Sequence, residues 1–237
     1  MNKGENTKAF TLAEVLITLL VIGVLAMTTI PSLLQSWEER ETITKLKKTY
    51  SILQQAYQLA VVENGSPSTW TNNTYYLREL RPFLKLADTG GVFQHCCFYD
   101  GNYKYLDGRE ISTWGSLYKI NWDKLLLIDG VALLTFSTDA TCSLDSYISN
   151  PSTCAIIMAD INGAKPPNQN GKDCFYFGLT EKGIIPLGGN SPGMLFSHNS
   201  YCRSISSSGF SCARWVIERG NMEYLHKMRS LEAEMVK

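Results

Sequence analysis

The sequence predicts an α+β fold, in which one long N-terminal helix precedes a head built around an antiparallel β-sheet. Three observations support this prediction. Residues 15–37 carry no charge, the segment after them keeps the apolar spacing of a helix to about residue 64, and the remainder holds short β-rich runs separated by turn residues. A chain of 237 residues is long enough to bury a sizeable core.

The uncharged stretch is the first element that needs an explanation. At ~1.5 Å per residue it is long enough to cross a hydrocarbon layer of about 30 Å. It is too long for the apolar core of a cleaved secretory signal. An ordinary signal anchor fits the length but leaves Glu14 unexplained, since a carboxylate inside a span costs roughly 2.5–3.5 kcal/mol on insertion scales.

The stretch KAFTLAEVLITLLVIGVLAMTTIP, residues 8–31, resembles the N-terminal processing and methylation motif of type IV prepilins and pseudopilins. The resemblance implies that a short basic leader stays in the cytoplasm and that a membrane peptidase cuts between Ala9 and Phe10. Phe10 then becomes the N-methylated first residue of the mature chain. The family most often has Gly before the cut, where this chain has Ala9.

The resemblance also gives Glu14 a role in assembly. Cleavage creates a positive amine at Phe10, one helical turn from the carboxylate of Glu14. In a staggered filament of parallel helices, Glu14 of one subunit meets the amine of a neighbour. Because a misregistered neighbour leaves both charges unpaired in an apolar medium, we expect the pair to set the register of the filament.

Two residues weaken the second half of the apolar helix. Pro31 cannot donate a hydrogen bond to the carbonyl of Met27, and Gly23 has a low helix propensity. By resemblance, residues 23–31 are the segment that loses helix on assembly. A static proline kink in a membrane helix is the alternative.

Beyond the apolar stretch the helix is predicted to continue as an amphipathic spine. One apolar stripe has alternating spacings of three and four residues, which is typical of a helix that docks on a sheet. Its members are Ile43, Leu46, Tyr50, Leu53, Tyr57 and Ala60. Gly65 and Pro67 follow Asn64 and predict the end of the helix there.

The head is predicted from short apolar runs. Residues 130–137, 154–161 and 173–179 read as strands, and 93–99 is a weaker candidate. With no helical crossover between them, neighbouring strands should pair antiparallel. A short helix is expected within residues 70–87, ending near Arg81 because Pro82 follows. Residues 212–226 are expected to supply a last buried strand or packing segment around Trp215, Val216 and Ile217.

Together with the resemblance, these elements predict a pilin-like fold. Its parts are a cytoplasmic leader (1–9), a transmembrane and filament-core helix (10–34), an amphipathic spine helix (35–64) and a globular α+β head (65–237). The resemblance places the chain in the inner membrane with its head outside the cytoplasm, and later in a periplasmic or cell-surface filament. The partners it implies are other pilin subunits, the prepilin peptidase and the assembly machinery of the inner membrane.

One segment of the head collects side-chain oxygens at close spacing. They belong to Asp160, Asn162, Asn168, Asn170 and Asp173. Several pseudopilins hold calcium in a loop at the end of the sheet, and calcium takes six to eight oxygen ligands. Asx-rich turns are also common without a metal, and the spacing does not match an EF-hand. A plain turn and a calcium site both remain open, and no other cofactor is expected.

Seven cysteines lie in the C-terminal two thirds of the chain, without the spacing of a zinc site. With export of the head, structural disulfides are expected. Cys142 with Cys154, and Cys202 with Cys212, each close a short loop. Cys174 is then expected to bond Cys96 or Cys97, which leaves one cysteine free.

The remaining function classes receive less support. The net charge is zero, and the three histidines belong to no recognisable catalytic motif, so the chain is predicted not to be an enzyme. A DNA-binding competence pilin would need a stripe of basic and aromatic side chains on the surface of its head. The candidates for it are scattered: Arg78, Arg81, Lys85, Lys104 and Lys119 near Tyr75, Tyr76, Tyr103 and Trp122.

The sequence therefore predicts a structural subunit of a type IV pilus or of a secretion pseudopilus. Two alternatives remain, a DNA-binding minor pilin and a membrane-anchored extracytoplasmic receptor or enzyme. The membrane is an expected partner and nucleic acid is not.

Overall fold

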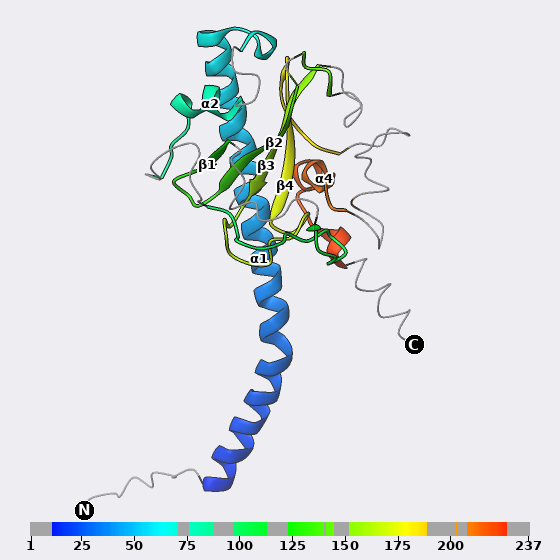
Figure 1. Ribbon diagram of the computed structural model, residues 1–237. Coiled ribbons are helices and arrows are strands. Elements are labelled where there is room, and N and C mark those ends of the chain that lie inside the picture. Colours follow the sequence, from blue (N-terminus) through cyan, green and yellow to red (C-terminus); the bar gives the residue numbers. More distant parts are fainter. Residues whose placement is uncertain are drawn as a thin grey trace, which may run out of the picture. The chain divides into compact units, whose positions relative to one another are not determined.

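The computed structural model describes residues 11–70, 76–87, 97–112, 123–139, 141–144, 152–188, 202 and 208–226. The chain divides into two compact units, Met1–Glu41 and Thr42–Lys237, and each is described by itself. The elements of both are drawn in Figure 1.

The first unit contains the start of helix α1, which runs from Leu12 to Asn64. The apolar side chains from Leu12 to Trp37 are exposed in the isolated chain. The helix continues through Gly23 and Pro31 without a break. The loss of helix expected for residues 23–31 on assembly is therefore not a property of the free subunit and stays a prediction for the assembled state.

In the second unit, the rest of α1 buries one face. Its buried residues are Leu46, Thr49, Leu53, Ala56, Tyr57 and Ala60, while Ile43 and Tyr50 pack at the edge of the core. The apolar stripe predicted for the spine is thus the face that the helix buries. The helix ends as predicted: Gly65 adopts a left-handed φ of 79°, and its N–H donates to the carbonyl of Val61 at 3.0 Å.

The sheet is a five-stranded antiparallel meander in the order β1-β2-β3-β4-β5. Its strands are Lys124–Leu126, Ala132–Thr138, Thr153–Asp160, Cys174–Thr180 and Gly183–Pro186. The three predicted strands correspond to β2, β3 and β4, and their antiparallel pairing is confirmed. The short edge strands β1 and β5 were not predicted. Of the weaker candidate 93–99, residues 93–96 lie outside the described residues, and 97–99 do not form a strand.

Both faces of the sheet are covered. One face packs on α1, where the rings of Tyr50 and Phe177 stack at 5.9 Å and Gln54 donates to the carbonyl of Ile184 at 2.6 Å. The other face packs under a second apolar cluster that includes Phe98 and Tyr103 from the segment 97–112. Because both faces are buried, β3 and β4 are buried along their whole length.

Three short helical elements flank α1 and the sheet. The turn η1 spans Pro67–Thr69, helix α2 spans Tyr76–Leu80, and η2 spans Arg81–Phe83. The short helix expected before Pro82 is therefore present as α2.

The closing segment is a helix, α4 (Cys212–Arg219), and the expected last strand is wrong. Trp215 and Val216 are buried, as expected of a packing segment. Two local features favour helix over the β propensity of the Trp-Val-Ile run. Arg214 and Glu218 pair one turn apart at 2.6 Å. Gly220 has a left-handed φ of 66° and donates to the carbonyl of Val216 at 2.9 Å, which caps the helix.

Candidate functional site

The apolar helix is the first candidate site. Ala9 and Phe10, the predicted processing and methylation site, lie outside the described residues. Among the described residues, α1 is the helix long and apolar enough to cross a membrane, and none of its apolar window is buried. That exposure excludes a core helix, whereas a membrane anchor and an N-terminal signal sequence both fit.

Glu14 has a local structural role at the start of this helix. The backbone N–H and the hydroxyl of Thr11 donate to Oε2 of Glu14 at 2.8 and 2.9 Å. In return, the N–H of Glu14 donates to the hydroxyl oxygen of Thr11 at 3.3 Å. This reciprocal pair is a capping box, which satisfies backbone donors that the first turn leaves unpaired. Within the described part of the chain, no ion pair joins Glu14 to a cation.

The second candidate site lies between β3 and β4, where the predicted Asx-rich loop connects the two strands. Asp160 ends β3, and Asp173 precedes β4. Their carboxylates and the Sγ atom of Cys174 all lie within 4.8 Å of one another, and all three residues are buried. The structure therefore brings together the two acidic residues of the predicted loop and adds Cys174, which was not predicted to join them.

Asp173 closes the loop by accepting backbone hydrogen bonds. The N–H of Asn168 donates to its Oδ2 at 2.8 Å and that of Gln169 to its Oδ1 at 2.7 Å. The side chain of Asn170 is engaged elsewhere: its Oδ1 accepts the hydroxyl of Tyr176 at 2.7 Å, and its amide donates to the carbonyl of Ser208 at 3.1 Å. Asp173 thus closes the turn, whereas Asn170 ties the loop to Tyr176 of β4 and to Ser208.

Asp160 is held by a residue that is distant in sequence. The hydroxyl of Tyr103 donates to its Oδ2 at 2.8 Å, within the buried interior. Burial raises the pKa of Asp160, and the neighbouring Asp173 carboxyl raises it further. Burial also raises the pKa of Asp173 and of the Cys174 thiol. Because the two carboxyls are close, the state in which Asp160 and Asp173 share one proton is favoured over the state in which both are charged.

The loop fits a calcium site only in part. In favour, the Oδ1 atoms of Asn162 and Asn168 are buried and find no hydrogen-bond partner in the described residues. Against it, Asn170 is committed to other partners, and Cys174 places sulfur where calcium prefers oxygen. The plain turn therefore accounts for more of the contacts than the metal does.

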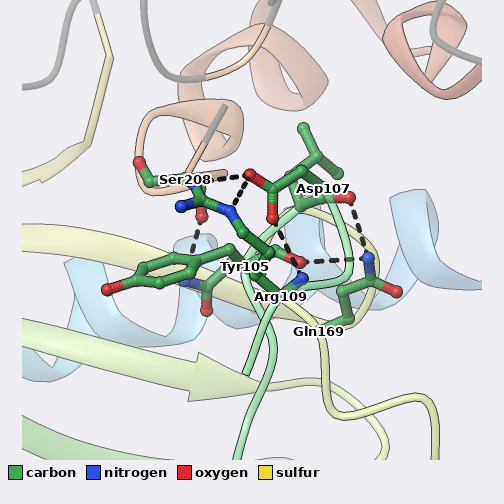
Figure 2. A network of polar contacts seen from close by, with 7 residues as sticks. Tyr105, Asp107, Arg109, Gln169 and Ser208 are labelled. Carbon is green, nitrogen blue, oxygen red and sulfur yellow. Dashed lines mark hydrogen bonds and ion pairs between the residues drawn. The ribbon is translucent and has the colours of Figure 1, made fainter. Parts of the chain in front are cut away.

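A polar network ties this loop to the segment that covers it. The amide of Gln169 donates to the carbonyls of Tyr105 and Leu106 at 3.0 and 2.8 Å, and Asp107 pairs with Arg109 at 2.8 Å (Figure 2). The Arg109 guanidinium also lies 5.6 Å from the centre of the Tyr105 ring. The two contacts of Gln169 join residues 64 and 63 positions apart, and no local sequence pattern predicts them.

In the described part of the head, the two candidate rings of a basic aromatic stripe are buried. Tyr76 and Tyr103 are each 1% exposed, so neither ring is available to stack on a base. Tyr75, Lys119 and Trp122 lie outside the described residues.

The structure contains the disulfides Cys142–Cys154 and Cys202–Cys212, the two pairs that the short loops predict. The third predicted pair is wrong, because Cys174 is free and buried. Its thiol lies 3.5 Å from Oδ1 of Asp173 in the acidic cluster. Cys97 forms a disulfide that does not include Cys174, and Cys96 lies outside the described residues.

Comparisons with known proteins give one match. No curated protein matches the chain, and no solved structure matches it. One family model, described as a family of unknown function (DUF6613), matches residues 32–184. The match begins inside α1, after most of the apolar stretch, and covers the spine together with β1 to β4. Because it covers more than half of the chain, the protein belongs to this family of unknown function, DUF6613.

Proposed function

We propose that this protein is a structural subunit of a type IV pilus or of a secretion pseudopilus, assembled through its N-terminal helix. The observation that carries the proposal is the exposed apolar first part of α1, residues 12–37, in which Glu14 is the single charge and which follows the Lys8-Ala9-Phe10 sequence. A surface of this kind cannot stay in water, because burying it is worth about 25 cal/mol per Å². It must enter a membrane or pack against other helices.

Processing would convert this helix from an anchor into an assembly element. A prepilin peptidase would cut between Ala9 and Phe10 and leave a methylated amine at Phe10. The capping box occupies Oε2 of Glu14, and the described residues supply no partner for Oε1. That oxygen would accept the Phe10 amine of a neighbouring subunit, and each charge would compensate the other in the filament core.

The head would then form the surface of the filament. Its α+β body with a spine helix on an antiparallel sheet agrees with a pilin-like fold, and disulfides such as Cys142–Cys154 and Cys202–Cys212 suit an extracytoplasmic location. The subunit would begin in the inner membrane with the head outside the cytoplasm. It would leave the membrane with the assembly machinery.

The test is to replace Glu14 and follow assembly. Glu14→Gln keeps the shape and the cap acceptor but removes the charge, so the chain should remain in the membrane and disappear from sheared filaments. Glu38→Gln removes an exposed charge from the same helix and is the matched control, which should assemble as the wild type does. Normal assembly of Glu14→Gln would rule out the charge pair.

A second arm separates a filament subunit from an anchored receptor or enzyme. In cells without the prepilin peptidase, the proposed subunit should keep its leader and be absent from the filament fraction. A receptor that merely uses α1 as an anchor would work unprocessed. If the cellular process that needs this protein were fully active in those cells, the proposal would be contradicted.

A further inference from the structure

The two edges of the sheet are closed in different ways. An edge strand presents backbone N–H and C=O groups with which a strand of another molecule can pair. At the β1 edge, a segment of this chain takes these positions: Leu86 bridges Leu127, and the N–H of Ala87 donates to the carbonyl of Leu126 at 2.9 Å. At the β5 edge, no further strand pairs with β5 among the described residues. The outward backbone groups of β5 therefore face water or a side chain.

The register of β5 determines which of its residues turn outward. Directly after β5, the N–H of Leu187 donates to the carbonyl of Tyr176 at 2.9 Å. Because hydrogen bonding alternates along an antiparallel strand, Ile185 also directs its backbone toward β4, whereas Ile184 and Pro186 direct theirs away. Proline has no N–H. Within β5, the outward N–H is therefore that of Ile184.

Gln54 of α1 takes both outward groups of Ile184. Its Nε2 donates to the carbonyl of Ile184 at 2.6 Å, and the N–H of Ile184 donates to its Oε1 at 3.3 Å. A glutamine amide offers one acceptor and N–H donors side by side, as a backbone peptide group does. The side chain of Gln54 thus occupies the place of one residue of a neighbouring strand.

Two neighbours keep the Gln54 amide in this position. The second hydrogen of Nε2 is donated to the hydroxyl of Tyr50 at 3.0 Å, and the Tyr50 ring stacks on Phe177 of β4. Gly183 has a positive φ of 145°, and a Cβ at this residue would lie 3.3 Å from Oε1 of Gln54. The glycine therefore leaves the room that the amide needs to reach the edge.

We propose that Gln54 is an edge cap, which keeps β5 from pairing with a strand of another molecule. The strand that can use the uncapped edge is β5 of a second copy. In an antiparallel pair related by a twofold axis, Ile184 of each copy would donate its N–H to the carbonyl of Ile184 in the other. The contact is self-complementary, so it needs no other partner. The edge cap belongs to the head alone and does not depend on assembly into a filament.

The test uses the full-length chain in detergent and removes the amide. Gln54→Leu keeps the size of the side chain and a high helix propensity. Gln58→Leu makes the same chemical change at an exposed position of α1 and is the matched control. In sedimentation velocity over a series of concentrations, Gln54→Leu should show a severalfold larger fraction of dimer than the wild type and Gln58→Leu. Hydrogen exchange of the Ile184 amide should be slow in the wild type and should depend on concentration in Gln54→Leu.

A second variant, Gln54→Ala, separates an open edge from an added apolar side chain. It removes the same amide but adds no leucine, and alanine is a good helix former. The proposal requires both variants to dimerise. If both sediment as the wild type does at every concentration, Gln54 is not an edge cap. If Gln54→Leu dimerises and Gln54→Ala does not, the contact is made by the leucine and the proposal is also wrong.

Discussion

At the scale of single residues, the loop between β3 and β4 shows how the structure divides similar side chains between different tasks. Asp173 accepts two backbone N–H groups and closes the turn, while Asp160 faces Tyr103 inside the head. The Asx-rich composition predicts the turn, because such residues bond their own backbone. The partnership with Tyr103 joins residues 57 positions apart, and nothing in the local sequence indicates it.

The raised pKa values of Asp160 and Asp173 predict how the stability of the head depends on pH. In the unfolded chain both carboxyls titrate near 3.9. Because their folded pKa values are higher, their contribution to stability is fully present below about pH 4 and is lost as the pH rises through the folded values. The melting temperature of the full-length chain in detergent should therefore fall from mildly acidic to neutral pH. Asp160→Asn should flatten this fall.

The matched control for the pH profile is Glu63→Gln, an exposed change on α1. It should leave the slope unchanged. A wild-type melting temperature that rises over the same range would contradict the account of the buried pair.

The turn interpretation also predicts the response of the loop to calcium. Since Asp173 and Asn170 are engaged by hydrogen bonds, and Cys174 occupies one side of the cluster, calcium should not raise the melting temperature at neutral pH. Removing divalent ions with a chelator should also have no effect. A calcium-dependent rise that Asp160→Asn abolishes would instead assign the orphaned oxygens of Asn162 and Asn168 to a metal.

At the scale of elements, the spine of α1 is the best predicted part of the head. Its apolar spacing identifies the buried face because period 3.6 is a strong signal over several turns. The strands β2, β3 and β4 follow from β-rich apolar runs, whereas β1 and β5 have only three and four residues and give no comparable pattern. For α4, the β propensity of Trp215, Val216 and Ile217 is overridden by the cap at Gly220.

Substitutions on the spine should separate its two faces. Leu53 is fully buried, so Leu53→Ala should lower the free energy of unfolding by about 2–5 kcal/mol. Leu59 is 51% exposed on the same helix, and Leu59→Ala should cost less than about 0.5 kcal/mol. Urea unfolding followed by circular dichroism measures both. Equal effects would mean that α1 does not pack on the sheet as described.

The disulfides should stabilise the head far more than the free thiol does. Replacing both Cys202 and Cys212 by Ala removes a link over a sequence separation of 10 and should cost about 2–4 kcal/mol under oxidising conditions. Cys174→Ala removes a buried thiol without breaking a link, so its effect should be clearly smaller. If Cys174→Ala were the more destabilising change, the assignment of Cys174 as unlinked would be wrong.

At the scale of the whole molecule, the head and the N-terminal segment are defined by different observations. The head is defined by its own core, and the family match covers its spine and most of its sheet. The N-terminal segment is defined by sequence and exposure, and the residues of the proposed processing site, Ala9 and Phe10, precede the described helix. The function proposed for the N-terminal segment therefore rests mainly on its sequence. The chemistry described for the head rests mainly on the structure.

The most direct test of the filament proposal is the N-terminal mass of the chain recovered from sheared surface filaments. The account predicts a peptide that begins at Phe10 and carries one added methyl group on its amine. A chain that begins at Met1, or at a signal-peptidase site within the apolar stretch, would contradict it.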